Sequence, residues 1–257
     1  MPDPVVRCSV AEAVATITLD SPVNRNALSS ALVADLHTAL DRAETDDVRV
    51  IVLTNTGSTF CAGADLRERL AGPVDSSPVV RAFRRLMESR RPTIAAVKGV
   101  VRAGGIGLMA SCDLVVVERR ANFAFTEVRI GAAPAMIAVP LLRRCSAAQL
   151  TAAFLTGEVF DAELARMIGL VSHVADGADG ADGVDGVVAT LCRGLMEGAP
   201  GALAATKEVL RTVPGEPVSS AFSRMQELSE RLFTGTEARE GMQSFLDKRR
   251  PSWAPPP

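Results

Sequence analysis

Three short apolar segments separated by helical patterns constrain the fold of this chain most strongly. They are Val48–Thr54 (VRVIVLT), Thr93–Val97 (TIAAV) and Asp113–Glu118 (DLVVVE). A strand that is apolar on both sides must be covered on both faces, which is typical of parallel sheets. Leucines recur at helical spacing over residues 28–40, and Gly105–Ser111 is a short helix candidate. Strands that alternate with helices predict a parallel α/β arrangement.

The last third of the chain has helical patterns and no strong strand pattern. Four segments there are expected to be helices: Ala147–Thr156, Asp161–Met167, Ala199–Val213 and Ala221–Phe233. We therefore expect an α/β core over residues 1–198, followed by a helical region and tail over residues 199–257. Such a helical end often packs against a neighbouring subunit.

One segment, Asp176–Gly186 (DGADGADGVDG), is acidic and of low complexity. Its aspartates recur at every third position, which is not the ligand spacing of an EF-hand calcium loop. We expect a solvated, mobile acidic loop.

Composition excludes several classes of function. The formal net charge is −2 and no basic stripe is present, so nucleic acid is not an expected partner. No apolar run is long enough to span a bilayer, and the first residues lack the pattern of a signal peptide. The five cysteines show no metal-ligand or CxxC spacing, which favours reduced thiols in a cytoplasmic protein.

Two loops rich in small residues follow two of the expected strands. Phe60–Leu66 (FCAGADL) comes after the first strand, and Arg102–Leu108 (RAGGIGL) comes after the second and opens a helix. Small residues allow close backbone approach and leave N–H groups exposed, and a helix N-terminus adds positive potential. Loops from adjacent parallel strands, each offering one N–H group to the same oxygen, would form an oxyanion hole.

Glu127, in the segment FAFTEVRIG, is a candidate acid/base residue. Burial among its apolar neighbours would raise the pKa of its carboxyl group, which suits general acid–base catalysis. The ordinary alternative is a surface carboxylate, or an ion pair with Arg129. Asp65 by itself is better explained as the first residue of a helix.

A dinucleotide-binding loop is a further alternative, because Gly105–Ala110 matches GxGxxA. That fingerprint requires its first glycine directly after a strand, and an acidic residue about 20 positions later. Here Gly99–Ala103 intervenes and Glu118 comes too early, so we do not favour this interpretation.

Together these features resemble the enoyl-CoA hydratase/isomerase (crotonase) family over nearly the whole chain. The motifs that support the resemblance are Asn26–Ser29, Phe60–Leu66, Pro92–Gly99, Ala103–Leu108, Ser111–Asp113, Leu155–Gly157, Ala165–Val171, Glu240–Gly241 and Phe245–Pro251.

The resemblance implies a spiral of ββα turns with a C-terminal helical trimerisation region, in a homotrimer or a dimer of trimers. It implies an acyl-CoA thioester substrate, with no metal and no cofactor beyond the coenzyme A that the substrate brings. The N–H groups of Ala64 and Gly104 would bind the thioester oxygen, and Glu127 would be the acid/base. The other residues expected at the substrate are Arg25, Ala62, Asp65, Leu66, Arg67 and Gly107, with Phe245 and Lys248 from a neighbouring subunit.

This chain departs from the family pattern at one important position. Hydratases of the family carry two glutamates, and Gly107 stands where the first would be, while Glu127 matches the second. The usual Gly-Gly pair is also replaced within Ala132–Ile137. The acyl pocket is expected within residues 66–86 and 132–142.

Three functions therefore stay open. The first is a 2-enoyl-CoA hydratase of fatty-acid or related acyl-CoA breakdown that uses Glu127 alone. The second is an enoyl-CoA isomerase in which the same carboxylate shuttles a proton. The third is a catalytically weak acyl-CoA-binding homologue.

Overall fold

Two sheets form the centre of the structure, a computed structural model that describes residues 3–45, 47–177 and 180–255. The larger sheet has the strand order β1-β2-β3-β5-β7-β10, and the smaller has the order β4-β6-β8-β9. The large-sheet strands are β1 Val6–Ala11, β2 Val14–Leu19, β3 Val50–Asn55, β5 Thr93–Val97, β7 Leu114–Glu118 and β10 His173–Ala175. The small-sheet strands are β4 Thr59–Cys61, β6 Val100–Arg102, β8 Asn122–Ala124 and β9 Phe160–Asp161.

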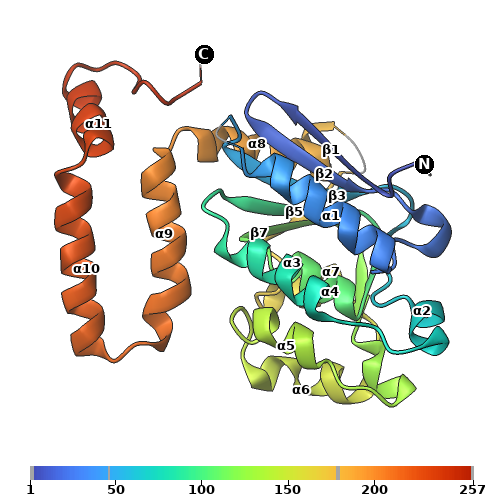
Figure 1. Cartoon of the computed structure of the whole chain (residues 1–257). Helices are drawn as coiled ribbons and strands as arrows, with labels where there is room; N and C mark the ends of the chain where they lie inside the picture. The colour runs from blue at the N-terminus through green and yellow to red at the C-terminus, as the bar shows by residue number, and fades with distance from the viewer. Residues whose placement is uncertain (1–2, 46, 178–179, 256–257) are drawn as a thin grey trace.

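The same turn of chain is repeated three times through these sheets. Each turn contributes one strand to the large sheet, one short strand to the small sheet, and then one or more helices (Figure 1). The strands β2, β3, β5, β7 and β10 are parallel, whereas β1–β2 and β8–β9 are antiparallel. The helices between the strands are α1 Ser30–Ala43, α2 Leu66–Ala71, α3 Ser77–Glu88, α4 Gly104–Ala110, α5 Ala135–Leu141, α6 Ala147–Thr156 and α7 Ala162–Met167. This arrangement confirms the predicted spiral of ββα turns.

The large sheet is covered on both faces, as its apolar strands predicted. Ile51 and Leu53 of β3 belong to the main hydrophobic core, with residues of α1, α3 and α4. Val50 and Val52 point the other way, into a second core that is completed by the helix α8 (Val184–Met196). The period of two along a strand divides its side chains between these two cores.

The acidic segment is only partly the loop that the sequence predicted. Its last residues form the start of α8, where Asp185 lies in the first turn and pairs with Lys98, with Nζ and Oδ2 2.8 Å apart. An acidic side chain in the first turn of a helix is favoured by the helix dipole. Residues 178–179 of this segment lie outside the described residues.

The C-terminal third also contains two short strands, contrary to expectation. β9 pairs with β8 and β10 pairs with β7. With two and three residues respectively, each is too short for its alternation of polar and apolar residues to be recognised in the sequence.

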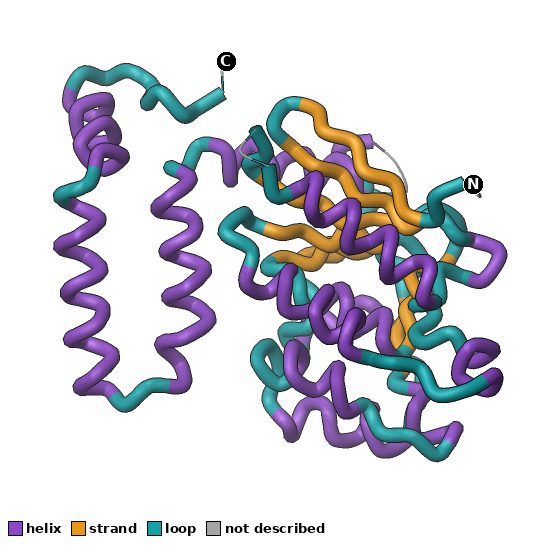
Figure 2. The backbone as a smooth tube through the Cα atoms, in the orientation of Figure 1, coloured by secondary structure: helices purple, strands orange, loops and turns teal. Residues whose placement is uncertain are grey.

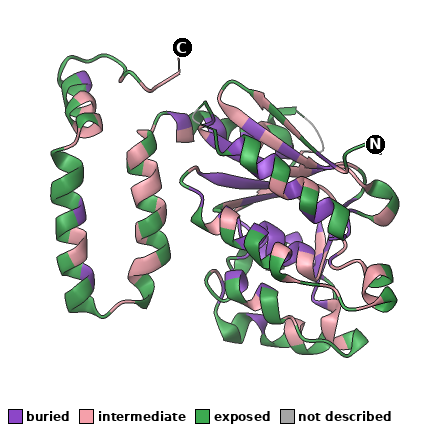
Figure 3. Cartoon of the chain, in the orientation of Figure 1, coloured by how far each residue is buried: buried purple, intermediate pink, exposed green. Residues whose placement is uncertain are grey.

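The remaining helices are α9 Pro200–Thr212, α10 Val218–Phe233 and α11 Thr236–Leu246. Figure 1 shows α9 and α10 as an antiparallel pair beside the sheets. Figure 2 shows that all the strands lie on one side of this pair. Most of α10 is exposed (Figure 3). The tail returns towards the end of α8, because the indole N–H group of Trp253 donates to the Glu197 carbonyl at 3.0 Å.

A lysine connects α9 to the large sheet. Lys207 Nζ lies 2.5 Å from Asp113 Oδ2 and donates to the Arg91 carbonyl at 2.7 Å. The same Asp113 oxygen accepts from the backbone N–H and the hydroxyl of Thr93, at 2.7 and 2.9 Å. The Lys207 side chain is 11% exposed and the Asp113 side chain 31%, so this ion pair is partly shielded from solvent screening.

Two further findings concern the whole of the described chain. No helix among the described residues is long and apolar enough to cross a membrane. All five cysteines are free, and all but the half-buried Cys8 are buried, in keeping with the reduced thiols that the sequence predicted.

The Lys207 contact leads to a prediction about stability. Lys207→Met should lower the free energy of unfolding by about 1–3 kcal/mol, because it leaves a partly buried carboxylate without its cation. Urea unfolding followed by circular dichroism measures this loss. Arg211→Met, one turn later on α9 and exposed, is the matched control. Equal stability of the two variants would contradict the role assigned to Lys207.

Candidate active site

The loops that leave β4 and β6 lie against each other. These two strands are parallel neighbours, with Thr59 opposite Val100, so their loops emerge at the same edge of the small sheet. A Cβ atom added to Gly63, where φ is +87°, would lie 2.9 Å from Ala103 Cβ, and one added to Gly105 would lie 2.5 Å from the Cys61 carbonyl oxygen. Only glycine allows backbones to approach this closely.

This contact brings two unpaired N–H groups to one place. Gly104 is the first residue of α4, so its N–H group has no acceptor within the helix. The first loop is held by hydrogen bonds from Leu28 N to the Gly63 carbonyl at 2.8 Å and from Ala62 N to the Arg25 carbonyl at 3.0 Å. Within the described chain, the N–H groups of Ala64 and Gly104 have no acceptor. Two such donors side by side are what an oxyanion hole requires.

Ala103, just before α4, has a strained backbone. Its φ of 46° and ψ of −120° place it in a region that residues with a Cβ atom rarely adopt. Such a conformation costs of order 1–3 kcal/mol and persists only where the surrounding structure holds it. The strained peptide directly precedes the Gly104 N–H group, so the strain is located at the expected oxyanion hole.

Glu127 lies in a 3-10 helix, Thr126–Ile130, that follows β8. Its Oε2 atom is buried and has no hydrogen-bond partner among the described residues. Burial therefore raises the pKa of the Glu127 carboxyl group above its ordinary value. The alternative ion pair with Arg129 is absent from the described structure, because that guanidinium donates instead to the Thr156 carbonyl, at 3.2 Å.

One cavity of about 480 Å³ brings Ala64, Gly104 and Glu127 together. Its wall is otherwise mainly apolar, with Glu127 as the sole carboxylate among the described lining residues. Both stretches expected at the acyl pocket contribute to the wall. The apolar lining residues are Leu28, Ala62, Leu66, Val79, Phe83, Ala103, Ile130, Ala132, Ala133, Pro134, Ala135, Met136 and Ile137.

Gly107 is buried beneath α5 and does not line this cavity. A Cβ atom added there would lie 2.4 Å from Ile137 Cγ2 and 3.1 Å from Phe83 Cε2. The space that a second glutamate would need is therefore filled by a side chain of α5, and a glutamate at this position would have to displace that helix.

The other residues predicted from the first loop have different surroundings. Ala62 and Leu66 line the cavity. Asp65 is the N-cap of α2, and its Oδ1 atom accepts from the Arg67 N–H group at 2.9 Å. The side chains of Arg25 and Arg67 are exposed near the loop, and neither forms an ion pair with a described residue.

Phe245 and Lys248 are not brought to the cavity by this chain. They lie at the end of α11, which Figure 1 shows far from α2 and α5. The Phe245 side chain is 83% exposed. Their predicted role requires a neighbouring subunit and stays a prediction.

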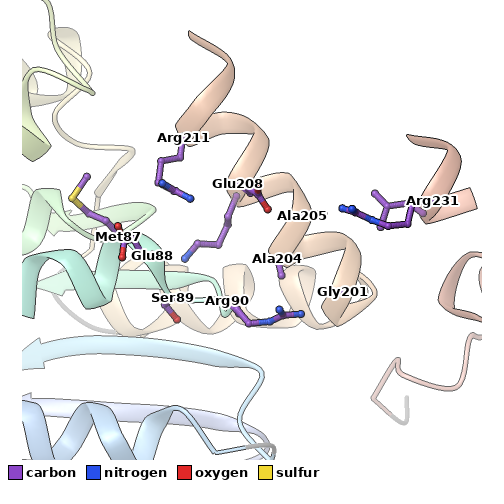
Figure 4. A pocket seen from close by; sticks show the side chains of 12 residues that line it. Met87, Glu88, Ser89, Arg90, Gly201, Ala204, Ala205, Glu208, Arg211 and Arg231 are labelled. Atoms are coloured by element: carbon purple, nitrogen blue, oxygen red, sulfur yellow. The ribbon is translucent and has the colours of Figure 1, made fainter. Parts of the chain in front are cut away.

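A second cavity, of about 320 Å³, lies between α9, α10 and the end of α3. Figure 4 shows Glu208 and Arg211 contributed by α9 and Arg231 by α10. The described lining residues of this cavity include neither Glu127 nor the two residues with unpaired N–H groups. Among the described residues, no group of His, Cys, Asp or Glu is placed to hold a metal ion. The expectation that no metal takes part stays a prediction.

Sequence reasoning missed several residues of the site. Arg69 and Ser76 line the cavity, and Ile137 fills the space over Gly107. Only the general expectation that residues 66–86 and 132–142 form the acyl pocket pointed to them. Ala103 carried no sequence signal at all, because alanine gives no hint of a positive φ.

Comparison with known proteins agrees with this geometry. The profile of the family described as "Enoyl-CoA hydratase/isomerase" matches residues 9–256. A putative enoyl-CoA hydratase from Thermus thermophilus is 36% identical, over 93% of this chain and 96% of that protein. The 2,3-dehydroadipyl-CoA hydratase of Escherichia coli is 32% identical, over 92% of this chain and 93% of that protein.

Solved structures give the same result for the fold. The crystal structure of an enoyl-CoA hydratase from Mycobacterium smegmatis superposes with a TM-score of 0.89 at 30% identity, covering 98% of this chain and 99% of that one. An enoyl-CoA hydratase from Mycobacterium avium is 43% identical with a TM-score of 0.73, over 98% of this chain and 99% of that one. The chain therefore belongs to the enoyl-CoA hydratase/isomerase family.

Proposed function

We propose that this protein hydrates 2-enoyl-CoA thioesters and that Glu127 is its single acid/base. The observation that supports this most directly is the Oε2 atom of Glu127, which is buried without a hydrogen-bond partner among the described residues, in a cavity that Ala64 and Gly104 also line. The names of the similar proteins from Thermus thermophilus and Escherichia coli, both hydratases, also favour it.

In the proposed reaction one carboxylate acts twice. Glu127 removes a proton from water as the water oxygen bonds to C3. The π electrons of the C2–C3 double bond then form a C1–C2 double bond, and those of the carbonyl group move onto the thioester oxygen. Glu127 then returns the proton to C2, and the thioester carbonyl forms again. The scheme needs no cofactor of the protein's own, because coenzyme A enters as part of the substrate.

The charge on the thioester oxygen is the difficult part of this reaction. We propose that the N–H groups of Ala64 and Gly104 stabilise it. Preorganised donors in a dry site cost no reorganisation during the reaction, and removing one costs about 2.7–4 kcal/mol in other enzymes. The exposed Arg25 and Arg67 beside the first loop can bind the phosphates of coenzyme A.

Isomerisation of 3-enoyl-CoA is the second candidate, and the side chain over Gly107 favours it. With Ile137 in the place of a second carboxylate, no other acid lines the cavity among the described residues to position water. One carboxylate is enough to take a proton from C2 and return it to C4. A binding protein without catalysis is less favoured, because a carboxylate oxygen that is buried without a partner costs stability and a binder has no use for it.

Turnover in H₂¹⁸O distinguishes the two reactions. The proposed hydratase, offered 2-enoyl-CoA and 3-enoyl-CoA thioesters separately, should yield from the former a product that has gained one molecule of labelled water, as measured by mass spectrometry. Glu127→Gln should lower kcat about 10²–10⁴-fold, because the amide cannot transfer the proton. Binding of a saturated acyl-CoA should change little.

The exposed Glu158→Gln is the matched control for this variant. Unlabelled product of unchanged mass with a moved double bond would replace hydration by isomerisation. Full activity of Glu127→Gln would remove the proposed catalytic role in both reactions.

The raised pKa of Glu127 also predicts a dependence of stability on pH. A carboxyl group with a higher pKa in the folded state stabilises the fold below its unfolded pKa of ~4.3, and this contribution is lost as pH rises through the folded value. Glu127→Gln should therefore be more stable than the wild type at neutral pH, and the difference should shrink near pH 4. Thermal unfolding across this pH range measures it, and a variant that is less stable at pH 7 would contradict the prediction.

We also propose that the C-terminal helices form the contacts of a homotrimer or a dimer of trimers. Large aromatic side chains on α10 and α11 are exposed, with 74% for Phe222, 66% for Phe233 and 83% for Phe245. Clustered exposed apolar residues are typical of protein interfaces. In such an assembly Phe245 and Lys248 would reach coenzyme A bound to a neighbour.

Light scattering after size exclusion tests this assembly. The expected mass is 81 kDa, three times 27.0 kDa, or twice that value. Phe222→Ser with Phe233→Ser should shift the mass towards one chain, because both changes remove apolar area from the proposed contact. A single-chain mass for the wild type at micromolar concentration would contradict the proposal.

A further inference from the structure

We call the cavity of about 480 Å³ that Glu127 lines the acyl cavity. Arg69 is the one cationic side chain among the described residues that line it. Its Nη1 atom donates to the Val74 carbonyl at 3.0 Å, and its Nη2 atom donates to the Ser76 hydroxyl at 2.9 Å. No described carboxylate pairs with it. A guanidinium group has five N–H donors, so three remain for a ligand.

The position of Arg69 separates two cavities. It lies on α2, three residues after Leu66, and both side chains line the acyl cavity. A neighbouring cavity of about 240 Å³, distinct from the one between α9 and α10, shares Leu28, Arg69 and Val79 with the acyl cavity. Arg69 therefore stands at a boundary of the acyl cavity, one helical turn beyond the loop that carries Ala64.

An apolar acyl chain does not match this boundary. The wall is mainly hydrophobic, and a cation that loses water without gaining a counter-charge is strongly disfavoured. A ligand carboxylate would restore the balance, because the planar guanidinium binds carboxylates with two parallel hydrogen bonds. The Ser76 and Val74 contacts hold the guanidinium in place, which lowers the entropy lost when a ligand binds.

We propose that Arg69, oriented by Ser76, selects acyl groups whose distal end is a carboxylate. The preferred substrates are then coenzyme A thioesters of short unsaturated dicarboxylic acids. This inference rests on the proposed function for turnover, but binding of the acyl group is independent of it.

The competing explanation is purely structural. Arg69 connects α2 to residues 74–76 just before α3, and it would then affect all acyl groups equally. The two roles differ in one observable, which is the discrimination between a charged and a neutral acyl end.

Calorimetric binding of two saturated ligands of equal length tests the proposal. Hexanoyl-CoA and the mono-CoA thioester of hexanedioic acid differ mainly in the distal carboxylate. The wild type should bind the acidic ligand at least about tenfold more tightly, and higher salt should reduce this preference, since a charge-assisted pair contributes that much. Equal affinities in the wild type would overturn the proposal without any variant.

Arg69→Met should abolish the preference by weakening the acidic ligand alone. Arg84→Met, on the exposed face of α3, removes the same charge elsewhere and should keep the preference. An equal loss for both ligands in Arg69→Met would assign Arg69 to loop structure only and overturn the proposal.

Turnover separates this inference from the proposed function. The matched substrates are 2-hexenoyl-CoA and its analogue with a carboxylate at C6, and kcat/KM should favour the latter in the wild type. Preferential binding of the acidic ligand without turnover of either substrate would support the role of Arg69 and contradict the hydratase. Equal kcat/KM values for the two substrates would support catalysis and contradict the role of Arg69.

Discussion

The candidate site depends on a close contact between the backbones of two loops, which meet at glycine residues. The loops after β4 and β6 meet where Gly63 and Gly105 leave no Cβ atom, and any larger residue would collide with Ala103 or with the Cys61 carbonyl. This contact places two unpaired N–H groups side by side. Because the loops leave parallel neighbours in the small sheet, the repeated ββα turn itself brings them to the same edge.

The electrostatics of the cavity follow from its apolar wall. Low dielectric raises the pKa of Glu127 and strengthens any hydrogen bond that the two N–H groups make to a developing oxyanion. The same environment makes the unpaired carboxylate and the strained Ala103 unfavourable for folding. Both features are concentrated around one cavity, as expected when stability is given up for activity.

The packing of α5 on α4 decides which chemistry the cavity can support. Ile137 occupies the space over Gly107, so a second carboxylate cannot be restored by one substitution without moving α5. Among the described residues Glu127 is therefore the one carboxylate of the cavity, and the proposed reaction relies on it and on the two N–H groups. The other polar side chains of the wall belong to Arg69, Ser76 and Thr126, and we propose that Arg69 and Ser76 bear on the choice of acyl group rather than on proton transfer.

The sequence by itself determined the parallel strands β3, β5 and β7, several of the helices and the two small-residue loops, because period-two and helical patterns are local properties. It gave no indication of α3, α5, α8 or α11, and of α2 it indicated only the start at Asp65. It also indicated Glu127, whose neighbours are apolar. Only the tertiary structure decided that Glu127 is unpaired while Arg129 turns to Thr156, that Ile137 fills the place over Gly107, and that Arg69 faces the cavity. These outcomes depend on how the turns of the spiral pack together, which brings residues far apart in the sequence into contact. A local sequence pattern shows which face of a helix or strand a side chain is on, but it does not show which residues that side chain meets.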